Sequence, residues 1–222
     1  QAYLDRRKPG QSRYTTARNE GDEVEILSGV FEGQTTGTPI SMIVRNKDQR
    51  SRDYGNIAQT YRPGHADFGF DSKYGFRDYR GGGRSSGRET IGRVAAGAIA
   101  ARILKELGIT LQAYTSSIGP VSCHSYHPET IPENSFYMPD MVAAEKAAKY
   151  LEKCMKEEDS AGGVVECRIS GVPAGIGDPV FGKLDAAFAQ ALMSIGAVKA
   201  VEVGDGVQVS SMKGSTVNDG FH

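Results

Sequence analysis

The sequence lacks several features that mark particular classes of protein. It has no tryptophan and three cysteines, Cys123, Cys154 and Cys167. The cysteines form no CxxC pair and their number is odd, which argues against a disulfide framework and favours a reducing compartment. No hydrophobic run approaches the roughly 18 residues that a membrane helix needs, and the first residues carry no apolar signal segment. We therefore expect a cytoplasmic protein without membrane contact.

What the sequence does contain is an ordinary globular composition with an uneven distribution of charge. Hydrophobic residues make up 39% of the 222 residues and the formal net charge is −1, which excludes wholesale disorder and is enough for one large domain. Residues 42–93, however, hold 11 basic and six acidic side chains. Such a patch indicates an anionic ligand held in one place, whereas a nucleic-acid coat usually makes the whole domain basic.

Hydrophobic periodicity predicts strands alternating with helices. The expected strands cover residues 23–31, 40–45, 109–114, 164–169 and 198–203, and the first two should pair as antiparallel neighbours. The expected helices cover residues 86–107, 140–158 and 183–195. The pattern predicts a single α+β domain over residues 1–222, a layered sandwich of Ala-rich helices and antiparallel sheets, while residues 1–22 read as a polar arm.

Residues 46–86 form the most unusual stretch, a long, basic, glycine-rich and aromatic region without periodicity. Compact domains seldom contain so long an irregular loop unless it is functional or disordered. The aromatic content argues against disorder, so we interpret the stretch as an active-site region. Aromatic rings beside arginines could also stack on bases, so a nucleic-acid-binding module remains an alternative.

The end of this region resembles an anion seat. Gly81, Gly82 and Gly83 are followed by Arg84, Ser85 and Ser86, and Ser86 with Glu89 forms a capping box for the next helix. Backbone amides and a helix N-terminus can together bind phosphate. The alternative is a flexible loop that ends in an ordinary capped helix.

Two further groups of residues suit acid–base or anion chemistry. His65 follows Arg62 in an Arg-Pro-Gly-His segment, and histidine transfers protons readily near neutral pH; a lone histidine can equally be structural. The basic arm at residues 6–13 is a cationic cluster or a solvated tail. Cys123, His124 and His127 have no second ligand cluster, so we expect no metal.

Eight segments, spread in order over nearly the whole chain, are similar to one family, chorismate synthase. They are LDRRKPGQSR (4–13), LSGVFEG (27–33), TGTPI (36–40), DQRSRDY (48–54), RPGHAD (62–67), DYRGGGRSSGRET (78–90), SGVPAGIG (170–177) and ALMSI (191–195). So many long matches in sequence order make the resemblance specific.

The resemblance implies a lyase of the shikimate pathway, on the route to the aromatic amino acids. The family converts 5-enolpyruvylshikimate 3-phosphate to chorismate and phosphate by a 1,4-elimination that needs reduced FMN. By motif, His65 resembles the histidine that protonates the reduced flavin. Three residues resemble substrate-binding cations: Arg7, Arg13 and Arg62. Five resemble flavin contacts: Arg84, Ser85, Ser86, Gly196 and Ala197.

The resemblance also implies a homotetramer and, more weakly, a pyridine nucleotide (NADP) on the arginine arm. Two motifs of the family are absent, an N-terminal Gly-Glu-Ser-His-Gly and a C-terminal Arg-His-Asp-Pro. We therefore expect a chain that is incomplete at both ends, lacks part of the acid–base set and is inactive alone.

Overall fold

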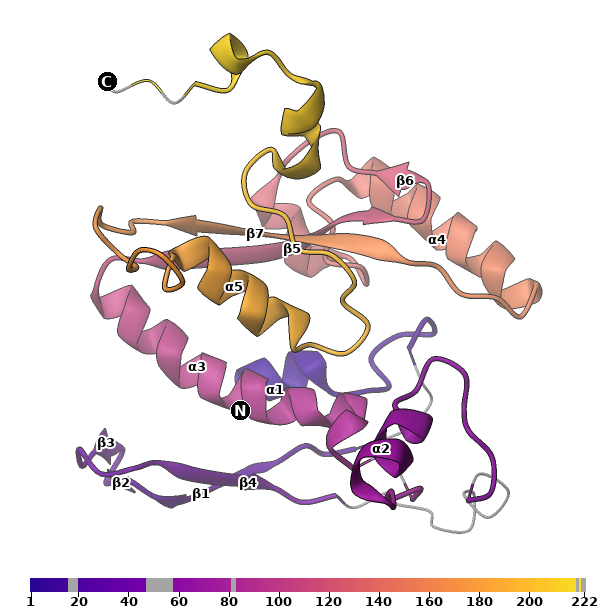
Figure 1. Cartoon of the computed structure of the whole chain (residues 1–222), viewed down its shortest axis with the longest axis vertical. Helices are drawn as coiled ribbons and strands as arrows, with labels where there is room; N and C mark the ends of the chain where they lie inside the picture. Colours follow the sequence, from indigo (N-terminus) through magenta and orange to yellow (C-terminus); the bar gives the residue numbers. More distant parts are fainter. Residues whose placement is uncertain (16–19, 47–57, 81–82, 219, 221–222) are drawn as a thin grey trace. The chain divides into compact units, whose positions relative to one another are not determined.

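The computed structural model describes residues 1–15, 20–46, 58–80, 83–218 and 220. The chain divides into two compact units, each made of two separate stretches. The first unit comprises residues 1–49 and 91–172, and the second comprises residues 50–90 and 173–222. Figure 1 labels the elements of both units.

The first unit contains all the β-structure that the described residues form. Its elements are α1 (Ala2–Arg7), β1 (Val24–Ser28), β2 (Val30–Phe31), β3 (Gln34–Thr35), β4 (Ser41–Val44), most of α3 (Thr90–Glu106), β5 (Thr110–Ile118), β6 (Val121–Ser122), the 3-10 helix η4 (Pro128–Glu133), α4 (Met141–Lys156) and β7 (Gly163–Ser170). Every strand pair is antiparallel. The predicted pairing of the first two long strands is confirmed, with Val24 opposite Val44, and β5 lies between β6 and β7.

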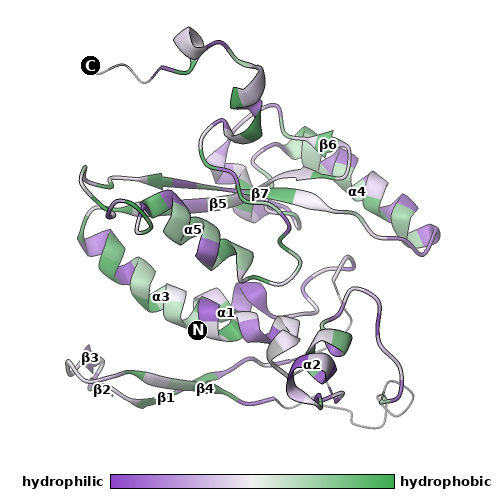
Figure 2. Cartoon of the chain, in the orientation of Figure 1, coloured by the Kyte–Doolittle hydropathy of each residue, from purple (hydrophilic) through white to green (hydrophobic). Residues whose placement is uncertain are grey.

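Two hydrophobic clusters hold this unit together. In the first, Leu4 of α1 packs with Ile91 and Ala95 of α3, and apolar residues of β1 and β4 lie against them; Figure 2 shows hydrophobic residues along β1, β4 and α3. In the second, Met138 packs with the alanines of α4. Helix α4 buries Ala143, Ala144 and Ala147, while Met141 and Met155 are exposed, so small side chains form its buried face.

The second unit is built differently. Its elements are α2 (Asp67–Tyr74), the 3-10 helices η2 (Gly83–Ser85) and η3 (Gly87–Glu89), α5 (Leu184–Met193), and the 3-10 helices η5 (Gly206–Ser211) and η6 (Gly214–Thr216). Helix α5 buries no residue fully. Among the residues described in this unit, the one that is buried is Asp67, which is 3% exposed. A carboxylate, rather than an apolar side chain, therefore occupies its best-protected position.

The predicted strand at residues 198–203 is wrong, because this stretch is irregular and pairs with no described strand. Two helices lie where loops were predicted. Helix α1 lies inside the expected arm and is fixed by Leu4, which is 2% exposed. Helix α2 lies inside the expected loop at 46–86 and ends at Gly75, whose φ of 78° is left-handed. The predicted helices near 86–107, 140–158 and 183–195 are confirmed, as are the strands near 109–114 and 164–169.

In the described part of the chain, no helix is long and apolar enough to cross a membrane.

Candidate active site

The Arg-Pro-Gly-His segment is anchored by a buried ion pair. The Nε and Nη2 atoms of Arg62 donate to the two carboxylate oxygens of Asp67, at 2.9 Å each. The backbone amide of Arg62 donates to the same carboxylate at 3.1 Å. This two-pronged geometry is the strongest that an arginine and a carboxylate can form. The chain between the two residues is thereby closed into a short loop.

His65 lies at the tip of this loop. Its backbone amide donates to the carbonyl oxygen of Arg62 at 3.2 Å, and Gly64, with a φ of 73°, makes the turn. The imidazole is exposed, and its Nδ1 lies 3.2 Å from the carbonyl oxygen of Pro63. The structure thus brings two predicted site residues, Arg62 and His65, together on one turn and leaves the ring open to a ligand.

A second arginine supports the same segment. Arg77 pairs with Asp71 of α2 at 2.9 Å and donates to the carbonyl oxygens of Ala58 and Thr60. Its guanidinium also lies over the ring of Tyr61, 4.8 Å from the centroid. Residues 58–78 are therefore tied together by two arginine–aspartate pairs rather than by an apolar core.

The ion pair at Asp67 sets its charge. The hydrogen bonds from the Arg62 side chain hold the pKa of the Asp67 carboxyl well below its usual range. The Arg62 amide and the charges of Arg62 and Arg77 act in the same direction, and burial opposes them. Asp67 is therefore a carboxylate at all physiological pH values.

The predicted flavin segment at residues 84–86 forms the short 3-10 helix η2 and its connection to η3. The hydroxyl of Ser86 accepts a hydrogen bond from the Arg88 amide at 3.1 Å, so Ser86 is a cap, as predicted, but it caps η3 immediately before α3. Ser85 is exposed and Ser86 half-buried. Gly81 and Gly82, two of the three glycines in the predicted anion seat, lie outside the described residues, as does the motif at 48–54.

Gly196 and Ala197 follow α5 in a turn that is exposed. Ala197 has a φ of 71°, a left-handed conformation that is unusual for alanine. A side chain added at Gly196 would meet no atom within 4 Å.

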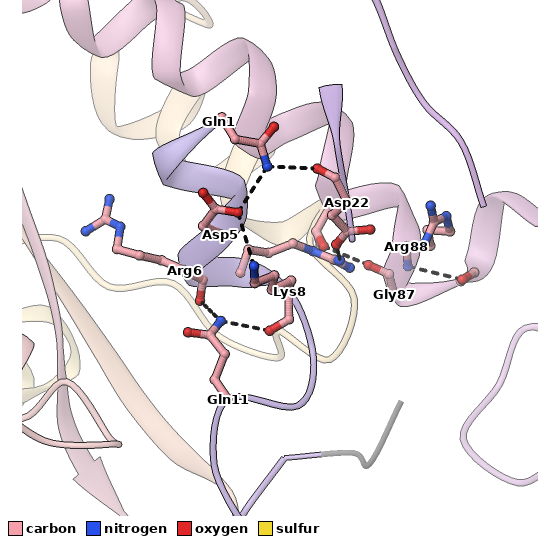
Figure 3. A network of polar contacts seen from close by, with 11 residues as sticks. Gln1, Asp5, Arg6, Lys8, Gln11, Asp22, Gly87 and Arg88 are labelled. Carbon is pink, nitrogen blue, oxygen red and sulfur yellow. Dashed lines mark hydrogen bonds and ion pairs between the residues drawn. The ribbon is translucent and has the colours of Figure 1, made fainter. Parts of the chain in front are cut away.

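The two arm arginines that are predicted to bind substrate, Arg7 and Arg13, belong to the first unit. Arg7 pairs with Asp22, which is 3% exposed, at 2.9 Å. Figure 3 shows the surrounding network, in which Gln1 donates to Asp5 and to the carbonyl oxygen of Asp22. Arg13 forms an ion pair with Glu152 of α4, and the ring of Tyr14 lies 4.9 Å from that of Phe136. Residues 6–13 are thus held by specific contacts, because Arg7 forms an ion pair with Asp22 and Arg13 forms one with Glu152.

The first unit holds a polar cluster that the sequence analysis did not single out. The hydroxyl of Tyr114 donates to Glu166, and the guanidinium of Arg168 lies 3.9 Å from the centroid of Tyr126. Burial and the neighbouring Glu166 carboxylate raise the pKa of Tyr114 to about 12. The Glu-x-Arg spacing of Glu166 and Arg168 carries no recognisable signal, because the cluster depends on the register of β5 with β7.

Cys123, His124 and His127, which are all among the described residues, do not form a cluster of metal ligands. The Cys123 thiol contacts the carbonyl oxygen of Thr115, and His127 lies beside Glu129. Within the described residues, no three histidine, cysteine or acidic side chains come close enough to hold a metal ion. All three cysteines are free thiols.

Comparison with known proteins gives a consistent result. The family model for chorismate synthase matches residues 1–222. The chorismate synthases of Agathobacter rectalis and Lachnoclostridium phytofermentans are 63% and 62% identical to the chain over its whole length. A crystal structure of a chorismate synthase superposes with a TM-score of 0.79 at 32% identity and covers 99% of the chain. The chain spans 61% of the length of these two relatives and 64% of that solved chain.

Proposed function

Because the chain belongs to the chorismate synthase family, we propose that the protein is a lyase that converts 5-enolpyruvylshikimate 3-phosphate to chorismate and phosphate. In this 1,4-elimination one C–O bond breaks, phosphate leaves with the bonding electrons, a proton is lost and a double bond forms. There is no net oxidation or reduction. The observation that carries the proposal is the family match over residues 1–222, and the exposed His65 on its arginine-anchored turn supports it.

The substrate is an anion with two carboxylates and a phosphate, which suits the arginines of the site. Arg62 is directed by Asp67, and Arg7 and Arg13 are the other two cations proposed to bind it. Guanidinium groups bind carboxylate and phosphate oxygens in pairs of hydrogen bonds. Charge placed where the phosphate departs lowers the barrier to C–O cleavage. His65 is proposed to give a proton to the reduced flavin.

Reduced FMN is the proposed cofactor. The residues proposed to hold it are Arg84, Ser85, Ser86, Gly196 and Ala197; the exposed Ser85 hydroxyl and the open backbone at Gly196 fit a polar, phosphate-bearing group. When bound, the reduced flavin would supply electron density that assists loss of the phosphate. His65 would act near it by holding or releasing a proton.

We extend the proposal to a cytoplasmic homotetramer, in line with the family. Val164 and Val165 of the edge strand β7 are 56% and 71% exposed, and an exposed strand edge is a surface on which a second copy of the chain can pair. A pyridine nucleotide on the arginine arm is the weaker proposal, because the anionic substrate needs the same side chains. Sedimentation analysis of the purified protein tests the assembly.

The experiment that tests the function mixes the full-length protein that contains this chain with reduced FMN under anaerobic conditions and adds 5-enolpyruvylshikimate 3-phosphate; every activity measurement uses this full-length protein. We expect a change in the flavin absorbance spectrum followed by release of phosphate. No spectral change and no phosphate would refute the proposal. Oligonucleotide binding that is unaffected by FMN, with a logarithmic salt slope steeper than about 4, would favour the nucleic-acid alternative instead.

A further inference from the structure

We propose that Asp67 is a positioning residue of this active site, which aims the Arg62 guanidinium and holds the turn so that Nε2 of His65 is the nitrogen that exchanges a proton. The inference rests on the proposed function for its kinetic consequences. Its structural part, the state of the His65 ring, stands on the geometry alone.

Asp67 is the most protected residue among those described in its unit. It is 3% exposed and is the one buried residue among those described there. A buried carboxylate is costly unless it is fully hydrogen-bonded, and Asp67 accepts from three donors, all of them on Arg62. The pair therefore fixes both the backbone and the side chain of Arg62, which an apolar residue at position 67 could not do.

Arg62 connects Asp67 to His65. The carbonyl of Arg62 accepts the His65 amide, while the amide of the same Arg62 residue is held by Asp67. The turn that carries the imidazole is thus closed at both ends by Arg62 and Asp67, which are five residues apart. Loss of the carboxylate would release the side chain and the backbone of Arg62 together, and the histidine with them.

The surroundings of the His65 ring determine which of its nitrogens carries the hydrogen. Nδ1 of His65 lies 3.2 Å from the carbonyl oxygen of Pro63. A carbonyl oxygen can accept but never donate a hydrogen bond, so Nδ1 must carry the hydrogen. In the neutral ring Nε2 is then the acceptor, and in the charged ring it is the donor that gives the proton away.

The test uses two measurements on the purified protein. A long-range proton–nitrogen NMR spectrum of neutral His65 should show a protonated Nδ1 and an unprotonated Nε2. Asp67→Asn, which is similar in size but uncharged, should give a mixture of the two tautomers. It should also lower kcat and raise KM, each by about tenfold or more, since a misplacement near 1 Å costs on the order of 100-fold.

Asp71→Asn is the matched control, because Asp71 lies on the same helix and pairs with Arg77 in place of Arg62. It should lose comparable stability, keep the Nδ1–H tautomer and change kcat less than threefold. If Asp67→Asn fails to fold, two other observations test the proposal. The wild-type ring should be the Nδ1–H tautomer, and Asp67→Glu, which keeps the charge, should retain part of the activity.

A dominant Nε2–H tautomer in the wild-type protein, or equal kinetic losses in the Asp67 and Asp71 variants, would overturn the inference. Failure of the proposed function would look different. The wild-type protein would then release no phosphate, but the NMR spectra of the His65 ring would still differ between wild type and Asp67→Asn.

Discussion

Two buried carboxylates, Asp67 and Asp140, are satisfied in contrasting ways. Asp140 is 6% exposed and accepts hydrogen bonds from the backbone amides of His124, Ser125 and Ala143. It caps α4 beside an apolar cluster. Asp67 instead accepts from an arginine, in a unit whose described residues include no buried apolar side chain. The first arrangement stabilises a helix, whereas the second orients a cation and an exposed histidine.

The groups that bind each buried carboxylate decide whether it contributes to folding or to chemistry. The amides that bind Asp140 lie at the start of α4 and in the loop at His124 and Ser125; as backbone groups they offer no side chain to a ligand, so Asp140 contributes to stability alone. An arginine held through two of its nitrogens keeps its charge near the site and limits its motion. The two arrangements should therefore respond differently to substitution.

Replacement of the exposed histidine should have the largest effect. His65→Ala is expected to lower the rate of phosphate release by about 10² to 10⁴, with little change in melting temperature, because the ring is exposed. The rate is measured anaerobically with reduced FMN. His127→Ala, at another exposed histidine, is the control and should keep the wild-type rate. A wild-type rate in His65→Ala would remove the proton-transfer role.

Replacement of the helix cap should affect stability instead. Asp140→Ala removes three hydrogen bonds to a charged acceptor and is expected to lower the free energy of unfolding by about 2–4 kcal/mol. Denaturant titration measures this value. The activity per folded molecule should stay unchanged. A large loss of kcat in fully folded Asp140→Ala would contradict the purely stabilising role of Asp140.

The contribution of Asp140 should also depend on pH. Hydrogen bonds from the backbone amides of His124 and Ala143 lower its pKa to about 2, below the roughly 3.9 of an unfolded aspartate. Its stabilisation is therefore complete above about pH 4 and is lost as the pH falls through 2. The stability difference between wild type and Asp140→Ala should shrink over that range. A difference that stays constant down to pH 2 would contradict this assignment.

Removal of the arm cation should weaken substrate binding. Arg13 has an exposed carboxylate partner, Glu152, which a substrate anion could replace. Arg13→Ala is expected to raise KM for the substrate by about tenfold and to leave flavin affinity unchanged. Lys153→Ala, at an exposed lysine paired with Glu157, is the matched control. Equal weakening of substrate and flavin would show that the arm does not distinguish between them.

The smallest effect is expected at the turn after α5. Ala197 has a left-handed φ of 71°, which glycine adopts without steric cost but with a larger loss of chain entropy. Ala197→Gly should therefore raise the free energy of unfolding by about 0.5–1 kcal/mol. Thermal unfolding measures the change, and a decrease in stability would argue against strain at this position.

Much of the first unit could be predicted from the sequence because its elements follow hydrophobic periodicity. Ser86 caps η3 immediately before α3, Gly108, whose φ is 77°, follows the end of α3, and β1 pairs with β4 as expected. Helix α1 was missed because one buried residue, Leu4, and the partners of Gln1 hold it in place. Contacts between distant residues leave no local period.

The sequence motifs predicted which residues belong to the site, but not the hydrogen bonds that hold them in place. His65 and Arg62 were recognised from one segment, and the structure places them on one turn. Asp67 stands in the same segment, yet its burial and its three hydrogen bonds to Arg62 could not be inferred from spacing. The predicted strand at 198–203 failed because alternation of apolar residues does not supply a pairing strand.

The most direct test of the contrast is phosphate release per folded molecule in Asp67→Asn and Asp140→Asn, with the folded fraction of each taken from its unfolding curve. Our account predicts that Asp67→Asn loses about tenfold or more of its kcat, while Asp140→Asn unfolds more easily but turns over like the wild type. Equal turnover in the two variants would contradict it.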